Sequence, residues 1–245
     1  MSGSNRKRLR VFAGPNGSGK STLFAKFSRK YDPGVFVNAD EIENSLHKNG
    51  YINLSDYNLQ TSPEDLQLYL STQESKSFIL KSTELGINQI GIDHRENCLI
   101  IPSQKVTPYS AAYAAAFIRW TLFHYGKSFS METVMSHPSK IQEIKNGNEL
   151  GYKTYLYFVC TDDPIINIDR VEARVRKGGH SVDVKKIVTR YQSTLQLLKE
   201  AVSITYRSYL FDNSGQKMIL LAESYNGQLK ILEDDLPYWF TSVFQ

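Results

Sequence analysis

Apolar runs alternate with segments of helical character along this chain. The apolar runs predict β-strands at residues 9–13, 34–40, 128–134, 154–160 and 209–214. The run at 154–160 is almost continuously apolar, which is typical of a strand that is covered on both faces in a parallel sheet. Helical segments follow most of these strands, so the pattern predicts an α/β fold with a doubly wound, mainly parallel sheet.

The helices are predicted from periodicity and from end signals. They are expected at residues 22–29, 63–85, 109–120, 164–176 and 183–201. The segment at 109–120 is apolar almost all round, which indicates a buried helix, and Arg119 is its one charge. We therefore expect Arg119 to extend to a helix end or to pair there, with a phosphate contact as the alternative.

Other stretches predict loops and hairpins. Residues 43–62 are polar and predict a loop, whereas residues 91–101 are compatible with a hairpin or a substrate loop. Residues 218–223 and 228–232, joined through Asn226-Gly227, predict a C-terminal β-hairpin. The aromatic tail at residues 238–240 is expected to pack back on the body.

Length and composition favour one domain over residues 1–245. A chain of 245 residues with 41% hydrophobic side chains can bury a sizeable core. Within this domain we expect a lid at about residues 163–182 and an inserted substrate segment at about residues 86–108.

A phosphate-loop motif follows the first predicted strand. The segment Gly14-Pro15-Asn16-Gly17-Ser18-Gly19-Lys20-Ser21 matches G-x-x-x-x-G-K-[ST], and Thr22 continues directly into a helical segment. Its glycines let backbone N–H groups turn toward phosphate oxygens at a helix N-terminus. The motif assigns Lys20 to the β- and γ-phosphates and the Ser21 hydroxyl to Mg²⁺. We therefore expect the residues from Gly14 to Thr22 to bind ATP with Mg²⁺.

Two carboxylates stand at the ends of predicted strands. Asp40 ends the run at 34–40, and Glu132 precedes Thr133 near the end of the run at 128–134. Ligands of open α/β sheets bind at the carboxyl ends of strands, so Asp40 can accept a proton from an attacking hydroxyl. The alternative for Asp40 is an N-cap of the next helix. Glu132 is expected at the substrate or, through water, at Mg²⁺, and Thr133 is expected at the substrate. A strand end that is neutralised by a nearby base is the alternative for Glu132.

Basic residues precede a Gly-Gly pair after the strongest predicted strand. Arg170 and Arg174 share a helix face, and Arg176 and Lys177 stand just before Gly178-Gly179. Arginines beside a glycine hinge suit a lid that closes over a transferring phosphoryl group, and Arg190 can point toward it. A solvated basic helix is the alternative.

Charge and cysteine content exclude several classes of partner and site. The formal net charge is +4, from 29 basic and 25 acidic residues, which makes nucleic acid an improbable partner despite the cluster Arg6-Lys7-Arg8-Arg10. Cys98 and Cys160 have no metal or redox spacing, and no run is long enough to span a membrane, so we expect a cytoplasmic protein.

Taken in order, the motifs resemble those of the zeta-toxin family of P-loop kinases. The resemblance covers about residues 9–220 and includes Asp40, the segment Glu132-Thr133-Val134, the arginines of 170–176, Gly178-Gly179-His180 and Asp212-Asn213. It implies ATP- and Mg²⁺-dependent phosphorylation of a nucleotide sugar such as UDP-N-acetylglucosamine. It also implies Asp40 as the base, Glu132 in the substrate site, Arg174 or Arg176 with Arg190 as lid charges, and an antitoxin protein as a partner. Ser181-Val182-Asp183 lacks the proline that many relatives carry after Gly-Gly-His.

Two other functions remain open at this point. A nucleotide-dependent switch would hydrolyse ATP slowly and act through a partner. A polynucleotide or nucleoside kinase would use the same phosphate loop with another acceptor, although the modest charge weakens the polynucleotide alternative.

Overall fold

A computed structural model describes residues 6–84, 86, 91–179 and 182–245. The chain divides into two compact units. Unit 1 comprises residues 1–33 and 130–245, and unit 2 comprises residues 34–129. Each unit is described by itself below, and the single domain expected from chain length stays a prediction.

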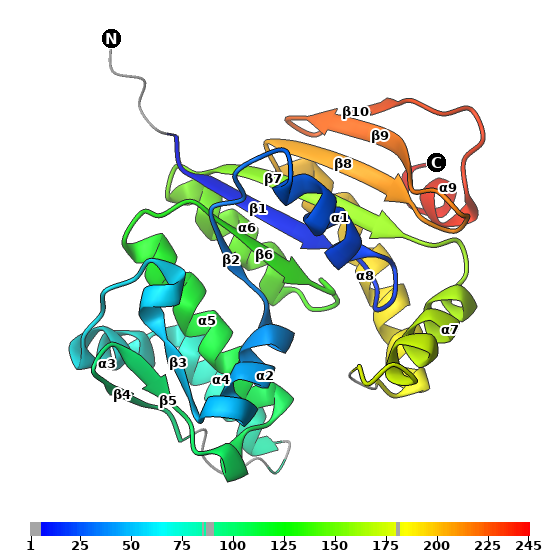
Figure 1. The fold of residues 1–245 in the computed structure, drawn as a ribbon. Helices are drawn as coiled ribbons and strands as arrows, with labels where there is room; N and C mark the ends of the chain where they lie inside the picture. Colours follow the sequence, from blue (N-terminus) through cyan, green and yellow to red (C-terminus); the bar gives the residue numbers. More distant parts are fainter. Residues whose placement is uncertain (1–5, 85, 87–90, 180–181) are drawn as a thin grey trace. The chain divides into compact units, whose positions relative to one another are not determined.

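Unit 1 is built on a sheet whose strands lie in the order β10-β9-β8-β7-β1-β6 (Figure 1). β1 pairs parallel with β7 and β7 with β8, while β8–β9 and β9–β10 are antiparallel. The parallel centre confirms the expected α/β fold, and β9 with β10 confirms the predicted C-terminal hairpin. The strands are β1 (Arg8–Ala13), β6 (Phe129–Thr133), β7 (Lys153–Cys160), β8 (Arg207–Asp212), β9 (Ile219–Tyr225) and β10 (Gln228–Ile231).

Helices cover the two faces of this sheet unequally. In Figure 1, α1 (Lys20–Ser28) lies on one face, and α6 (Ser139–Glu149) and α8 (Val184–Ile204) lie on the other. Val11, Leu156 and Leu210 are fully buried, whereas Tyr155 on the next pleat is partly exposed. The expectation that β7 is covered on both faces is therefore wrong for its first half. Two further helices, α7 (Pro164–Val175) and α9 (Tyr238–Phe244), complete unit 1.

Unit 2 combines helices with a small antiparallel sheet in the order β3-β5-β4. Its centre is α5, which confirms the predicted buried helix and includes Arg119 at 8% exposure. The elements are β2 (Val35–Val37), α2 (Ala39–Asn49), β3 (Tyr51–Asn53), the 3-10 helix η1 (Leu54–Tyr57), α3 (Pro63–Ser71), α4 (Gln73–Glu84), β4 (Asp93–Arg95), β5 (Cys98–Ile100), the 3-10 helix η2 (Ser103–Lys105) and α5 (Pro108–His124).

Two predictions for unit 2 are wrong. Residues 43–62 are not a loop, because Ile42 and Leu46 extend the apolar face of α2 until Gly50 ends it at φ +76°, and β3 and η1 follow. Residues 63–85 are not one helix, because Thr72 is extended (φ −68°, ψ 153°) and its hydroxyl accepts a hydrogen bond from the Ser75 N–H, 3.2 Å away. A β-region residue whose side chain caps the next turn ends one helix and starts another.

The segment at 91–101 is a hairpin, which confirms one of the two interpretations, whereas a substrate role for it stays a prediction. Glu96 and Asn97 have φ values of +49° and +60°, as a two-residue turn of this twist requires. The Asn97 side chain fastens the hairpin to the preceding segment by donating to the Leu59 carbonyl and accepting from the Thr61 N–H.

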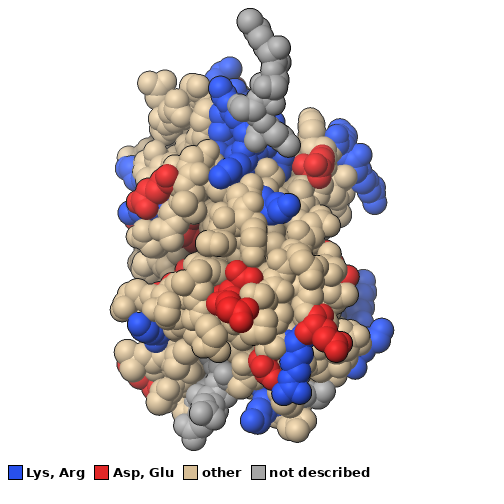
Figure 2. All heavy atoms as spheres, turned by 90° about the vertical axis from the view of Figure 1, so that its left-hand side faces the viewer, with Lys and Arg blue, Asp and Glu red and all other residues tan. Residues whose placement is uncertain are grey.

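The basic cluster at the start of β1 is only partly solvated. Arg6, Lys7 and Arg8 are exposed, and Figure 2 shows basic side chains gathered where the chain enters β1. Arg10 instead is buried, with its guanidinium 5.6 Å from the centre of the Phe27 ring and a hydrogen bond to the Pro33 carbonyl. No helix in the described residues is both long and apolar enough to cross a membrane.

Candidate functional site

The phosphate-loop motif forms a tight turn between β1 and α1. Gly14, Gly17 and Gly19 have φ values of +143°, +75° and +107°, a range that side chains rarely tolerate. Each glycine also faces a different neighbour. An added Cβ would lie 2.0 Å from the Val159 carbonyl oxygen at Gly14, 2.6 Å from that of Asn167 at Gly17, and 2.5 Å from Nδ2 of Asn213 at Gly19. Glycine is therefore required at each position for two reasons: the positive φ of the turn and the close approach of neighbouring atoms.

Two buried or half-buried amide side chains hold the outer side of this loop. Asn167 on α7 is fully buried, and its Nδ2 donates to the Asn16 carbonyl oxygen over 2.6 Å. Asn213, just after β8, donates from Nδ2 to the Ser18 carbonyl oxygen over 2.7 Å. The Asn167 side-chain oxygen accepts from the Thr161 hydroxyl at the end of β7. Both loop carbonyls are thus tied to the body of unit 1.

Several polar groups of the loop are available to bind a ligand. The Lys20 side chain is 7% exposed, and its Nζ donates to the Pro15 carbonyl oxygen over 2.8 Å. Ser18 Oγ and Asn16 Oδ1 are buried and make no hydrogen bond within the described residues. Buried polar atoms without a partner are costly and call for an explanation. A cradle closed by glycines, with unpaired polar atoms and a buried lysine, fits the phosphates of a nucleotide.

Ser21 and Glu132 meet at the start of α1. The Ser21 hydroxyl lies 3.1 and 3.0 Å from the two carboxylate oxygens of Glu132, near the end of β6. A hydroxyl beside a carboxylate at the mouth of a phosphate loop is a donor set that suits Mg²⁺, which prefers oxygen ligands. Thr133 has a different role, because its hydroxyl oxygen accepts from the Met135 N–H in the turn after β6.

The arginines of residues 170–176, which the sequence assigns to a lid, lie on α7 or at its C-cap and differ in environment. Arg170 is partly buried and its Nη1 makes no hydrogen bond within the described residues, whereas Arg174 and Arg176 are exposed. Arg176 is 4.0 Å from Glu172, a weak exposed pair. α7 ends at Val175, within one residue of the predicted end at 176, and Gly178 follows with a φ of +85°. His180 and Ser181 lie outside the described residues, and Arg190 is partly exposed on α8.

Asp40 is exposed in the first turn of α2, in unit 2. The N-cap of this helix is Asn38, whose side-chain oxygen accepts from the Asp40 N–H over 2.9 Å. The alternative interpretation of Asp40 as the cap is therefore wrong. Its carboxylate is left for another role at a helix N-terminus, where a negative charge is favourable.

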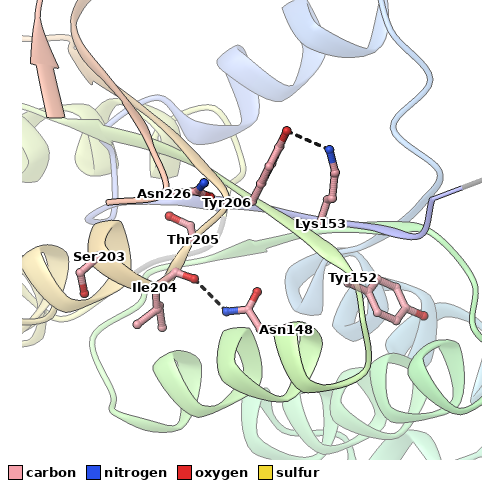
Figure 3. A pocket seen from close by; sticks show the side chains of 8 residues that line it. All are labelled: Asn148, Tyr152, Lys153, Ser203, Ile204, Thr205, Tyr206 and Asn226. Atoms are coloured by element: carbon pink, nitrogen blue, oxygen red, sulfur yellow. Dashed lines mark hydrogen bonds between the residues drawn. The ribbon is translucent and has the colours of Figure 1, made fainter. Parts of the chain in front are cut away.

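A separate hollow of about 330 Å³ lies at the opposite edge of the sheet from the phosphate loop (Figure 3). It is lined at the start of β7 by Lys153, which donates to the Tyr206 hydroxyl over 2.8 Å. Asn148 of α6 also lines it, and its Nδ2 donates to the carbonyl oxygen of Ile204 at the end of α8 over 2.8 Å. The phosphate loop contacts the other end of β7, at Val159, so this hollow is not part of the nucleotide site.

The sequence analysis missed Asn167. An asparagine on a predicted helix gives no signal of its own, because only the fold brings it to the loop from 151 residues away. The signal that could have found it is its place on the face shared with Val171, which is also buried. Asn213, which the family resemblance includes, contacts the loop through the Ser18 carbonyl oxygen.

No family model matches this sequence. An uncharacterized protein of Haemophilus influenzae is 31% identical over 127 residues, which cover 50% of this chain and 89% of that protein.

Solved structures share the fold at low identity. A chain of the AvrRxo1-ORF1:AvrRxo1-ORF2 complex with sulphate ions aligns with a TM-score of 0.59 and 14% identity, over 98% of this chain and 64% of that chain. A chain of the same complex with ATP aligns with a TM-score of 0.52 and 12% identity, over 93% of this chain and 61% of that one. This chain therefore spans less than two thirds of their length. The likeness confirms the fold expected from the zeta-toxin resemblance.

Proposed function

We propose that this chain, which belongs to the same family as the uncharacterized protein of Haemophilus influenzae, is an ATP- and Mg²⁺-dependent kinase. The observation that carries the proposal is the phosphate loop, in which the glycine conformations, Lys20 and the Ser21–Glu132 pair come together in unit 1. The likeness in fold to a chain crystallised with ATP supports the same ligand. The proposed reaction is transfer of the γ-phosphoryl group of ATP to a hydroxyl. We also propose a cytoplasmic location, where ATP is present.

Phosphate binding follows from the loop. Its N–H groups and the start of α1 face the β- and γ-phosphates, and Lys20 exchanges its bond to the Pro15 carbonyl for phosphate oxygens. Catalysis of phosphoryl transfer consists mainly of positioning and charge neutralisation, so a preformed loop supplies much of it. Ser18 Oγ gains the partner that it lacks among the described residues.

The Ser21 hydroxyl and the Glu132 carboxylate are the proposed Mg²⁺ site. The metal, when bound, neutralises charge between the phosphates. The sequence left a substrate role and a metal role open for Glu132, and the contact between these two side chains favours the metal role. Thr133 is bonded to its own turn and is a weaker substrate candidate than expected.

Asp40 is the proposed base for the acceptor hydroxyl, and α7 is the proposed lid. Asp40 is exposed and is not needed as a cap, so it is available to accept a proton from the attacking hydroxyl. Arg170 adds to Arg174, Arg176 and Arg190 as a charge for the transferring group, because its buried Nη1 lacks a partner in the described residues.

The proposed acceptor is a small molecule, with a nucleotide sugar such as UDP-N-acetylglucosamine as the first candidate. A protein partner of the antitoxin kind is also proposed, since the neighbour in fold was crystallised as a complex of two proteins. Co-purification with the product of an adjacent reading frame would test that partner.

The deciding experiment incubates the protein with γ-labelled ATP and panels of nucleotide sugars, nucleosides and oligonucleotides. We expect label on one small-molecule hydroxyl with Mg²⁺, and none with Lys20→Ala, which removes charge from the phosphate site. Label appearing on oligonucleotides alone would change the acceptor class. Label remaining in free phosphate with every acceptor would contradict the kinase and favour a nucleotide-dependent switch.

A further inference from the structure

We propose that the C-terminal helix α9 is part of the nucleotide site, because Trp239 positions Asn213 through Asp212 and so braces the phosphate loop. This inference rests on the proposed nucleotide function and adds to it a positioning residue far from the motif. Trp239 stands 220 residues or so beyond the loop in sequence, but three hydrogen-bonded steps join them.

The first step joins α9 to the end of β8. The Trp239 indole Nε1–H donates to Oδ1 of Asp212 over 3.0 Å, and the Trp239 side chain is 1% exposed. The Trp239 backbone N–H also donates to Asp162 just after β7, over 3.1 Å. α9 is therefore fastened to the turns that follow two adjacent parallel strands.

The second step fixes the residues on both sides of Asn213. Asp212 is 9% exposed and accepts from the Ser214 hydroxyl over 2.7 Å and from the Ser214 N–H over 2.9 Å. The Ser214 hydroxyl in turn accepts from the Asp162 N–H over 2.8 Å. The Asn213 backbone N–H donates to the Cys160 carbonyl, which extends the pairing of β8 with β7. Asn213 thus has little freedom as long as Asp212 is held.

The third step is the contact of Asn213 with the loop. Its Nδ2 donates to the Ser18 carbonyl oxygen over 2.7 Å and occupies the space where Gly19 has no side chain. In a trans peptide the C=O and the following N–H point in opposite directions. Holding the Ser18 carbonyl outward therefore aims the Gly19 N–H to the other side, toward the phosphates. Asn167 does the same for the Asn16 carbonyl and the Gly17 N–H.

The consequence is a loop whose N–H groups are oriented before a nucleotide arrives. Preorganisation of this kind raises affinity by removing the ordering cost of binding. If the brace is lost, the peptide between Ser18 and Gly19 can rotate and turn its carbonyl toward the phosphates. ATP binding in the ground and transition states weakens together, which raises KM for ATP and leaves kcat nearly unchanged.

The test compares three variants with the wild-type full chain. Trp239→Phe keeps an aromatic ring against Phe158 and removes the indole donor to Asp212. Asn213→Ala removes the brace itself. Phe240→Leu is the matched control, because Phe240 is also fully buried on α9 and makes no bond to Asp212. Hydrogen exchange of the backbone amides of residues 16–20 is measured without nucleotide, and the Kd for ATP is measured by calorimetry well below the melting temperature.

Trp239→Phe and Asn213→Ala are expected to speed loop exchange and to weaken ATP binding by a factor on the order of 10, the worth of one lost hydrogen bond. Phe240→Leu is expected to lower Tm and to leave both readouts at the wild-type value. Wild-type loop exchange and Kd in Trp239→Phe and Asn213→Ala, with Tm lowered as in Phe240→Leu, would overturn the inference. If the wild-type chain binds no ATP, the proposed function fails, and loop exchange alone then decides the brace.

Discussion

The Ser21 hydroxyl and the Glu132 carboxylate are 111 residues apart in sequence and about 3 Å apart in space, with distances of 3.0 and 3.1 Å. A carboxylate bonded to the serine of a phosphate loop supports our proposal of a metal role for Glu132 over a strand end that is neutralised by a base.

Glu132→Gln should therefore raise the Mg²⁺ concentration needed for half-maximal phosphoryl transfer, by about tenfold or more, because an amide oxygen is a poorer Mg²⁺ ligand than a carboxylate. Binding of ATP without Mg²⁺ should not weaken. Mg²⁺ titrations of activity measure the first effect and calorimetry the second. Glu149→Gln, at an exposed carboxylate of α6, is the control. An unchanged Mg²⁺ requirement would return Glu132 to the substrate site.

Asp40 gives a second residue-scale prediction. Because Asn38 caps α2, both Asp40→Asn and Asp40→Ala should keep the melting temperature close to that of the wild type. If Asp40 serves the acceptor hydroxyl, phosphoryl transfer should fall by a factor on the order of 10²–10⁴ in both variants, with ATP affinity retained. Asn38→Ala is the control, with about 1 kcal/mol of lost stability expected from the lost cap. Near-wild-type transfer by Asp40→Asn would move the base elsewhere.

The two cysteines should differ in reactivity. Burial raises the pKa of the Cys160 thiol at the end of β7, and its Sγ donates to the Thr161 carbonyl. Cys98 on β5 is partly exposed. A thiol is alkylated as the thiolate, so iodoacetamide at pH 8 should label Cys98 in the native protein and Cys160 only after unfolding. Peptide mass spectrometry reads both sites, and rapid native labelling of Cys160 would show that the strand end opens.

At the scale of elements, α7 connects two parts of the proposed mechanism. Its buried Asn167 holds the phosphate loop, and one turn later it carries Arg170 before the helix ends at Val175. A helix that is fixed to the loop near its start and is followed by a glycine with a positive φ, Gly178, suits a lid whose position depends on the nucleotide.

Trypsin cleavage after Arg174, Arg176 and Lys177 should slow when Mg²⁺ and ATP are added, because lid closure protects a segment that is exposed without nucleotide. Cleavage after the exposed Lys48 of α2 serves as the internal reference. Mass spectrometry of timed digests measures both. Equal cleavage at the three basic residues with and without nucleotide would contradict the lid.

At the scale of the molecule, the chain leaves unit 1 at Pro33 and returns to it at Ser130. The Ser130 hydroxyl donates to the Pro33 carbonyl oxygen over 2.5 Å, so the two ends are adjacent within unit 1. The phosphate loop, Glu132, α7 and α9 all belong to unit 1, whereas Asp40 belongs to unit 2. The nucleotide and acceptor roles that we propose are therefore divided between the units.

Replacing residues 34–129 with a short Gly-Ser linker should leave a folded unit 1 that binds ATP, because a short closure between adjacent ends costs little entropy. Transfer to the acceptor should be lost with Asp40. Calorimetry with ATP and the labelled transfer assay measure the two. Loss of both folding and ATP binding would show that unit 1 depends on unit 2.

Local sequence determined the phosphate loop, the main strands and the approximate positions of most helices. Gly14, Lys20 and Ser21 lie within eight residues and follow an apolar strand, so their chemistry is readable from spacing alone. The C-terminal hairpin is equally local, since Asn226-Gly227 selects its turn. The failure at residues 63–85 is also local, because one polar residue, Thr72, ends a helix there and gives a weak signal.

Only the tertiary structure decided which distant side chains meet this loop. Asn167 belongs to no motif, and the motifs that contain Glu132 and Asn213 name no partner on the loop. These residues reach the loop because parallel strands bring their carboxyl ends, and the segments that follow them, to one edge of the sheet. The role of Trp239 depends on a fold-back of the chain end onto that same edge. Residue spacing predicts neither the contacts of these side chains with the loop nor the packing of α9. Both depend on strand order and register, which the whole fold determines.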